Sequence, residues 1–249
     1  MKVNLISKTT FASDEEFINS FEGVGEAELL TVQIARVSSD RSDLSAEADR
    51  LINYLIKHNH WSPFEHAYLG VKIETSRAIG TQILRHRSFT FQELSQRYKD
   101  LSSLTLEEMF EIPELREKGS TNRQGSLEVF DPKLNTILDG EIGHTQSSYL
   151  IKRVLESLMN AYKILIEANV APECARMVLP LCTKTTIYMT GSIRSWIHFL
   201  VQRMDPHAQK EIRLIAYEIW EIFKEQLPMI SKALLKDETS IFYKYETRD

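Results

Sequence analysis

Apolar and polar residues alternate along the chain with two different periods, and each period predicts a type of secondary structure. Apolar residues three and four positions apart are typical of a helix with one buried face. The chain is predicted to form helices at about 43–58, 78–86, 146–168, 193–201 and 207–226. Alternation at every second position predicts strands at 69–74 and 185–190, an extended segment at 89–92, and a short opening strand at 3–6.

Residues 117–144 show neither period over any sustained length. Within them, residues 118–125 (KGSTNRQG) have the composition of a loop. We therefore expect an irregular segment here, the most mobile part of the chain. Further along, Pro172 suits the first turn of a short helix that carries Arg176.

The order of these elements predicts an α/β (α+β) fold. We expect a single domain, residues 1–249, with an antiparallel or mixed sheet flanked by several long helices, because no internal repeat or linker divides the chain. The G-x-G-x-x-G sequence that binds dinucleotide phosphates in a Rossmann fold is also absent. The fold is therefore not expected to be of the Rossmann type.

Composition narrows the classes of function. Of 249 residues, 43% are hydrophobic and 26% are charged, which is ordinary for a globular protein. A net charge of −5 disfavours a nucleic-acid polymer as partner, and no apolar run reaches the roughly 20 residues of a membrane span. Two cysteines without a C-x-x-C pair do not indicate a disulfide framework. The sequence therefore predicts a cytoplasmic protein.

The candidate chemistry begins with a dense group of anion donors in residues 85–98 (RHRSFTFQELSQRY). Arginine binds phosphate through two parallel hydrogen bonds, a geometry that lysine does not offer. On an acidic chain, such a cluster indicates a small anionic ligand rather than a polyanion. A solvated loop with salt bridges is the alternative interpretation of a basic run taken alone.

Two other functions stay open from the residues themselves. His58, His60 and His66 with Glu65 are zinc-ligand types and would suit a zinc hydrolase, although their spacing is not that of a standard site. A non-catalytic nucleotide-binding module is the second alternative.

The two cysteines do not indicate cysteine catalysis. Cys174 and Cys182 have no recognisable general base nearby in the sequence, and small buried residues are the favoured interpretation of both.

Four segments together resemble the flavin-dependent thymidylate synthase family. Residues 85–95 resemble its signature, an arginine-histidine-arginine triplet followed after seven residues by serine. Residues 60–66 (HWSPFEH) are similar to its H-x-[ST]-P-F-E-H segment, and residues 175–180 (ARMVLP) to its A-R-x-x-L-P segment. Residues 191–199 (GSIRSWIHF) with Arg203 match its last nucleotide-binding region. The segments occur in the family's order and span about 35–209.

The resemblance implies an enzyme that makes dTMP from dUMP for dTTP biosynthesis. Methylenetetrahydrofolate would supply the carbon, and FAD would mediate hydride transfer from NADPH, so that no cysteine is needed. It also implies a homotetramer whose active sites are shared between chains, with small molecules as the other partners.

The resemblance also implies the site residues. Arg203 is the expected catalytic residue, since a guanidinium would stabilise negative charge on the uracil ring, and His60 would position the folate or relay a proton. The positions that match dUMP contacts are Gln82, Arg85, Glu93, Leu94, Ser95, Gln96, Arg97, Arg176 and Arg203. The positions that match FAD contacts are Ser62, Arg85, His86, Arg87, Glu93, Ser192, Ile193, Arg194 and His198.

Four positions depart from the family's frequent residues. Thr90 and Gln92 stand where serine and asparagine are frequent, and Ser192 and His198 stand where some members have asparagine.

Overall fold

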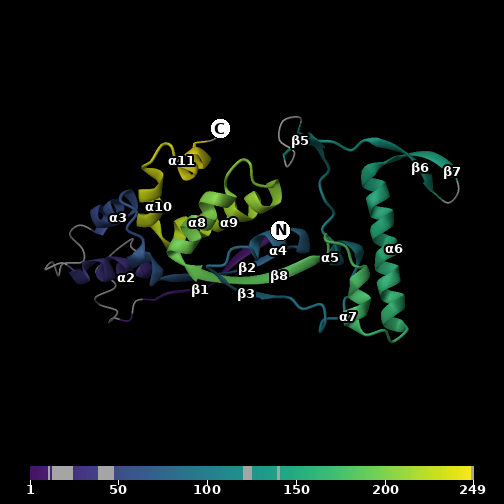
Figure 1. The fold of residues 1–249 in the computed structure, drawn as a ribbon, viewed down its shortest axis with the longest axis horizontal. Helices are drawn as coiled ribbons and strands as arrows, with labels where there is room; N and C mark the ends of the chain where they lie inside the picture. The colour runs from purple at the N-terminus through teal and green to yellow at the C-terminus, as the bar shows by residue number, and fades with distance from the viewer. Residues whose placement is uncertain (11, 13–24, 39–47, 120–124, 139–140, 248–249) are drawn as a thin grey trace. The chain divides into compact units, whose positions relative to one another are not determined.

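A computed structural model describes the whole chain except residues 11, 13–24, 39–47, 120–124, 139–140 and 248–249 (Figure 1). The chain divides into two compact units. The first unit comprises residues 1–73, 83–92 and 188–249, and the second comprises residues 74–82 and 93–187.

The elements follow one another in mixed order. The helices are α2 (Glu26–Ala35), α3 (Ala48–Lys57), α4 (Arg77–Ile83), α5 (Leu106–Met109), α6 (Ser147–Glu167), α7 (Pro172–Ala175), α8 (Ile193–Arg203), α9 (Lys210–Gln226), α10 (Pro228–Leu235) and α11 (Ile241–Glu246). The strands are β1 (Lys2–Lys8), β2 (Tyr68–Ser76), β3 (Thr90–Glu93), β4 (Arg116–Lys118), β5 (Ser126–Val129), β6 (Lys133–Leu138), β7 (Glu141–Gln146) and β8 (Lys184–Ser192). Short 3₁₀ helices are η1 (Arg36–Ser38), η2 (Ser62–Glu65) and η3 (Arg176–Val178).

Most predicted elements are confirmed, and so is the α/β class. β1, β2, β3 and β8 form one sheet in the order β1-β2-β8-β3. The predicted helices at 146–168, 193–201 and 207–226 correspond to α6, α8 and α9, and α7 with η3 carries Pro172 and Arg176 as expected. The helix expected at 43–58 is α3, with residues 43–47 outside the described part of the chain.

The helix expected at 78–86 ends earlier than predicted. α4 stops at Ile83, and the backbone N–H of His86 donates to the Ile83 carbonyl, which closes a turn in place of further helix. A second turn follows, in which the N–H of Phe89 donates to the His86 carbonyl. The triplet Arg85-His86-Arg87 therefore lies in turns that lead into β3.

The expectation of an irregular segment at 117–144 is wrong. β4 pairs with β5, and β6 pairs with β7, as two antiparallel hairpins in the second unit. All four side chains of β5 are exposed, so the strand has no buried face and shows no alternation. Backbone hydrogen bonds hold such strands together without a sequence period. Residues 120–124, within the predicted loop, lie outside the described part.

The core of the first unit is aromatic. Trp196 and Phe199 of α8 are buried with Phe89, whose ring centroid lies 4.6 Å from that of Trp196. A Cβ on Gly191 would lie 2.4 Å from the Phe89 ring, a distance that Cβ atoms essentially never show. Glycine at position 191 therefore allows the Phe89 ring to pack against the backbone. The Trp196 indole N–H donates to the Leu69 carbonyl at 3.0 Å, which fixes α8 on β2. Figure 1 shows α8 and α9 along this sheet.

A buried carboxyl group joins the start of α2 to the start of α10. Glu28 is fully buried, and its carboxyl oxygens accept hydrogen bonds from the backbone N–H groups of Gly25 at 3.0 Å and Ile230 at 2.7 Å. Burial raises the pKa of Glu28 to about 7, although these N–H groups favour the charged form. The negative charge of Asp49 of α3 also raises this pKa. The Asp49 carboxylate lies 3.6 Å from Lys232 Nζ.

The last helix, α11, packs on α9. The Phe242 ring lies 4.6 Å from that of Trp220, and the rings of Tyr217 and Tyr245 stack at 4.3 Å. The Trp220 indole N–H also donates to Glu246 at 2.7 Å. α11 therefore covers a fully buried tryptophan.

The second unit has a separate core around α6. It contains Leu101, Leu106, Met109, Phe110, Leu155, Tyr162 and Ala175. The Tyr162 hydroxyl accepts the Leu101 N–H at 3.3 Å. The outer face of α6 leaves Tyr149, Val154 and Ile164 half or more exposed. No helix in the described part of the chain is long and apolar enough to cross a membrane.

Candidate functional site

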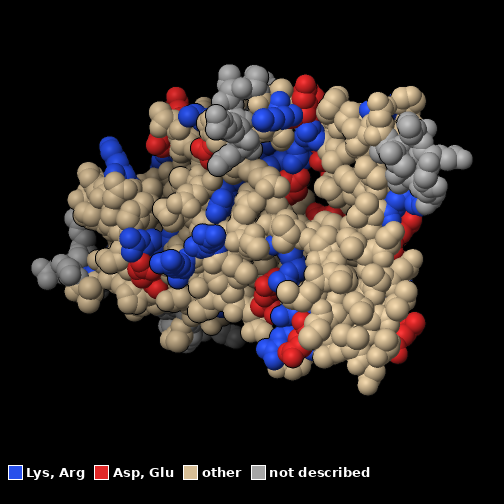
Figure 2. Space-filling model, turned by 45° about the vertical axis from the view of Figure 1, so that its right-hand side comes forward, with Lys and Arg blue, Asp and Glu red and all other residues tan. Residues whose placement is uncertain are grey.

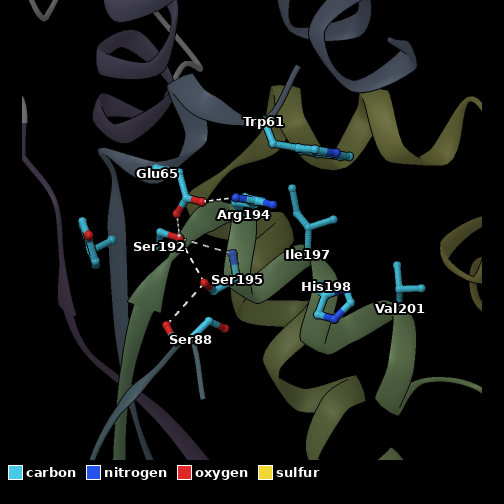
Figure 3. Close-up of a pocket in the computed structure, with 10 residues that line it drawn as sticks. Trp61, Glu65, Ser88, Ser192, Arg194, Ser195, Ile197, His198 and Val201 are labelled. Atoms are coloured by element: carbon cyan, nitrogen blue, oxygen red, sulfur yellow. Dashed lines mark hydrogen bonds and ion pairs between the residues drawn. The ribbon is translucent and has the colours of Figure 1, made fainter. Parts of the chain in front are cut away.

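A cavity of about 490 Å³ lies in the first unit beside α8 (Figure 3). We call it the α8 cavity; its lining residues are Trp61, Glu65, Tyr68, Ser88, Ser192, Arg194, Ser195, Ile197, His198 and Val201. They come from η2 and the residue before it, from β2, from the turn before β3, from the end of β8 and from α8. The cavity therefore gathers segments that are far apart in the sequence.

The start of α8 supplies the hydroxyl groups of the cavity. Ser192 ends β8 and caps α8, because its Oγ accepts the Ser195 N–H at 3.3 Å. The Ser192 and Ser195 hydroxyls lie 3.1 Å apart, and the Ser195 hydroxyl donates to the Ser88 carbonyl at 3.4 Å. Strand end, helix start and turn are thus linked at one wall of the cavity.

Glu65 of η2 links the Ser192 hydroxyl to the Arg194 guanidinium. Its Oε2 accepts the Ser192 hydroxyl at 2.8 Å, and its Oε1 accepts from Arg194 Nη1 at 2.5 Å. Figure 3 shows Glu65 pointing toward both side chains. Partial burial disfavours the charged form of Glu65, but the hydrogen bonds from Arg194 and Ser192 outweigh it and lower the pKa. Glu65 is therefore an ionised anchor for Arg194.

Arg194 and His198 lie one turn apart on α8, and both line the cavity, as their spacing predicts. The Arg194 side chain remains 53% exposed, so a ligand in the cavity can reach it. His198 Nε2 lies 2.9 Å from Gln202 Nε2. The apolar part of the wall comes from Trp61, Ile197 and Val201.

A second pair of polar side chains lies at the other end of α8. Arg203 Nε donates to His86 Nε2 at 2.9 Å. Burial, followed by the charges of Arg203 and His198, lowers the pKa of His86 to about 4. Burial also lowers the pKa of Arg203. His86 is therefore a neutral acceptor at neutral pH.

The second unit contains most of the positions expected to hold dUMP. Glu93 accepts the Thr185 hydroxyl at 2.9 Å and lies 4.0 Å from Arg77 Nη1. The Ser95 hydroxyl accepts the Arg97 N–H at 3.4 Å, and the Arg97 guanidinium lies 3.4 Å from the Glu173 carboxylate.

One buried polar atom in this region lacks a protein partner. Gln96 is only 4% exposed, and within the described residues its Nε2 has no hydrogen-bond partner. Buried donors are normally satisfied, so Gln96 Nε2 is a group that a bound polar ligand would suit.

The structure brings some of the expected residues together and leaves others apart. Ser192, Arg194 and His198 line the α8 cavity, and His86 contacts Arg203. Ile193 is buried, and its N–H donates to the Ala67 carbonyl. The remaining expected residues of the first unit are exposed and do not line the cavity: His60, Ser62, Arg85 and Arg87. The expected dUMP residues Gln82, Glu93, Leu94, Ser95, Gln96, Arg97 and Arg176 belong to the second unit.

Trp61, Ser88 and Ser195 were not expected as site residues, and Glu65 was considered only as a zinc-ligand type. Glu65 and Arg194 are 129 positions apart, and no local period links two residues at such a separation. The available signal for a role at the FAD site was the placement of Glu65 within the HWSPFEH segment, near the expected FAD residue Ser62.

The structure gives no support to a zinc site. In the described ranges, no group of three or more His, Cys, Asp or Glu side chains is arranged to hold a metal ion. The rings of His58 and His60 instead pack near Tyr54 at 4.4 and 5.7 Å. Glu65, the fourth member of the hypothetical set, is bound to Arg194 and Ser192.

The expected burial of both cysteines is wrong for Cys174, which is exposed, while Cys182 is partly buried. Cys174 lies on the short helix α7, where little packs over it. Burial raises the pKa of the Cys182 thiol, which lowers the fraction of reactive thiolate. Cys182 therefore lacks the environment of an activated nucleophile.

Comparison with known proteins identifies the family. A family model described as "Thymidylate synthase complementing protein" matches residues 22–229. The chain is 39% identical to a probable flavin-dependent thymidylate synthase of Paramecium bursaria Chlorella virus 1, over 86% of this chain and 93% of the relative. It is 38% identical to a flavin-dependent thymidylate synthase of Synechocystis sp., over 82% and 88%, and 37% identical to one of Kosmotoga olearia, over 89% and 91%. The chain therefore belongs to the family of flavin-dependent thymidylate synthases.

Proposed function

We propose that this protein catalyses the reductive methylation of dUMP to dTMP for dTTP biosynthesis. Methylenetetrahydrofolate is the carbon donor, NADPH is the reductant and FAD mediates hydride transfer. The observation that carries this proposal is a family match over residues 22–229 together with a cavity that gathers Ser192, Arg194 and His198 from the family's last nucleotide-binding segment.

The chemistry of the α8 cavity fits FAD. The Arg194 guanidinium, which stays 53% exposed, is a donor suited to a pyrophosphate. Trp61 and Ile197 offer apolar surface suited to a planar ring system. When bound, FAD supplies the hydride transfer, and the protein supplies binding, orientation and electrostatics.

Each set of residues keeps its proposed role. FAD is held by Ser62, Arg85, His86, Arg87, Glu93, Ser192, Ile193, Arg194 and His198. dUMP is held by Gln82, Arg85, Glu93, Leu94, Ser95, Gln96, Arg97, Arg176 and Arg203. His60 positions the folate or relays a proton.

Arg203 is the proposed catalytic residue. Its guanidinium stabilises the negative charge that develops on the uracil ring during attack. It is partly buried, so less water screens its charge than on an open surface. Removing a preorganised donor of this kind typically slows the reaction by about 10²–10³-fold.

We further propose a cytoplasmic homotetramer with shared active sites, built from one catalytic domain per chain. The family match extends over residues of both compact units, which supports a single functional domain. The exposed Val154 and Ile164 on α6 are large apolar side chains suited to an interface. Both cysteines are free, which suits a reducing compartment. On the face shown in Figure 2, basic and acidic side chains lie close together at several places, which suits small-molecule partners better than a polyanion.

The function is tested by purifying the protein and measuring dTMP formation. A yellow protein with a flavin absorption spectrum that forms dTMP only with dUMP, methylenetetrahydrofolate and NADPH supports the proposal. Colourless protein with stoichiometric zinc would favour a hydrolase, and dUMP binding without turnover would favour a nucleotide-binding module.

The assembly is tested by light scattering, where a tetramer gives about four times the chain mass of 28.8 kDa. Mixing Ser95→Ala with Arg194→Ala protein should restore some activity if chains share sites and subunits exchange. A fully active monomer would contradict the shared-site proposal.

A further inference from the structure

The hydrogen bond between His86 and Arg203 has a defined direction. Arg203 Nε carries a hydrogen and has no acceptor capacity, so at 2.9 Å from His86 Nε2 it is the donor. His86 Nε2 therefore presents a lone pair. Since one ring nitrogen of a neutral imidazole carries the proton, that proton is on Nδ1. The contact thus specifies both the charge and the tautomer of His86.

The surroundings of His86 favour this neutral form. The side chain is buried, and the charged groups that face it are Arg203 and His198, both on α8. Burial opposes protonation of the imidazole most strongly, followed by the electrostatic effects of Arg203 and His198, and the pKa falls to about 4. At neutral pH the ring is therefore available only as an uncharged acceptor for Arg203.

Aromatic packing restricts the His86 ring. Its centroid lies 4.8 Å from Phe199 and 6.3 Å from Phe89, both in edge-to-face geometry. Phe89 is in turn held close to Gly191 and to Trp196. The acceptor nitrogen of His86 is therefore held in place by a packed aromatic cluster.

We propose that His86 is a positioning residue for Arg203, which it orients by accepting the hydrogen bond from Nε. A guanidinium is planar with its donors in a fixed arrangement, so holding Nε sets the direction of both terminal nitrogens. This role rests on the proposed function of Arg203 and adds to the FAD contact proposed for His86. It gives the histidine of the arginine-histidine-arginine triplet a task that a third arginine would not perform, because arginine has no acceptor.

The first test measures the tautomer of His86 directly. In protein labelled with ¹⁵N-histidine, His86→Gln assigns the His86 signal by its disappearance. We expect a neutral ring protonated on Nδ1 that does not titrate between about pH 6 and 8. In Arg203→Ala protein, the pKa of His86 should rise toward the usual value of about 6.5. A charged His86 or one protonated on Nε2 at neutral pH would overturn the proposal, and this readout is independent of catalysis.

The second test asks whether His86 acts through Arg203. His86→Phe keeps an aromatic ring for Phe199 but removes the acceptor, and it should lower kcat by about 10–100-fold, as expected for misplacement of a catalytic group. In the Arg203→Ala background the same change should have little further effect, because interacting residues are not additive. His86→Gln, which offers an amide oxygen, should recover most of the loss. Additive losses would refute the positioning role.

Controls separate this role from flavin binding and from folding. FAD content is measured for every variant, because a loss that follows FAD occupancy alone would assign His86 to flavin binding only. His144→Phe, at an exposed position of strand β7, makes the same change outside both proposed sites and should keep wild-type turnover. If His86→Phe does not fold, His86→Asn, whose shorter side chain takes the acceptor out of reach, replaces it with the same expectation. A wild-type protein that forms no dTMP would refute the proposed function, whereas an active wild type with additive losses would refute the positioning role alone.

Discussion

The buried carboxyl group of Glu28 makes a quantitative prediction about stability and pH. In the unfolded chain its pKa is the usual 4.5, and in the folded protein it is about 7. Between these two values the folded protein holds a proton that the unfolded chain has lost. The contribution of Glu28 to stability is therefore fully present below pH 4.5 and is lost as the pH rises through about 7.

The size of this effect follows from the same two values. A pKa that rises from 4.5 to about 7 on folding changes the free energy of unfolding by about 3 kcal/mol across that range. Glu28→Gln removes the titration but keeps the shape of the side chain. It also replaces one carboxyl oxygen with an NH₂ group, which cannot accept a hydrogen bond from the backbone N–H of Gly25 or Ile230. The lost hydrogen bond lowers the free energy of unfolding by about 1–3 kcal/mol at every pH.

Urea denaturation followed by tryptophan fluorescence at several pH values measures both the pH-dependent effect of the titration and the pH-independent loss of the hydrogen bond. We expect Glu28→Gln to be less stable than wild type at about pH 5 and to recover up to about 3 kcal/mol relative to it by about pH 8. Glu26→Gln makes the same change two residues earlier on α2, at a side chain that is not fully buried, and should retain the wild-type pH dependence. Parallel pH profiles for Glu28→Gln and wild type would show that Glu28 is ionised throughout, and the reasoning from burial would be wrong.

Three further predictions concern catalysis and packing. Replacing both Cys174 and Cys182 with alanine should leave dTMP formation within about twofold of wild type, because the proposed chemistry uses hydride from FAD in place of thiolate attack; loss of turnover would indicate cysteine catalysis. Arg203→Ala should lower kcat by about 10²–10³-fold in the same assay, and unchanged kcat would remove Arg203 from the mechanism. Gly191→Ala should destabilise the protein by about 1–3 kcal/mol, because the new Cβ would meet Phe89 at 2.4 Å. An unchanged denaturation midpoint would show that Phe89 moves aside without cost.

Local periodicity predicted the elements that have one buried face. α6 and β8 alternate between core and surface, so their sequences report the geometry of the element. The hairpin strands β4 and β5 lack such a face and were missed, because their pairing depends on backbone groups that every sequence shares.

The site was predictable only in part, for a related reason. The arginine-histidine-arginine triplet and the 191–203 segment indicated candidate ligand-binding residues, because each is a compact motif. The contacts that organise them are distant in sequence: Glu65 with Arg194, and His86 with Arg203, 117 positions apart. Such pairs form only when the chain folds, and a single sequence has no local pattern that joins them.

The packing of α11 on α9 has a practical consequence for the limits of this protein. The family match ends at residue 229, before α11 begins at Ile241. A fragment trimmed to that limit would lose Phe242 and Glu246, and Trp220 would be left with an uncovered ring and an unpaired indole N–H. Exposed aromatic surface of this kind promotes aggregation. The residues that match the family model thus stop short of the residues that complete this hydrophobic core. Expression designs should therefore include the terminal helix.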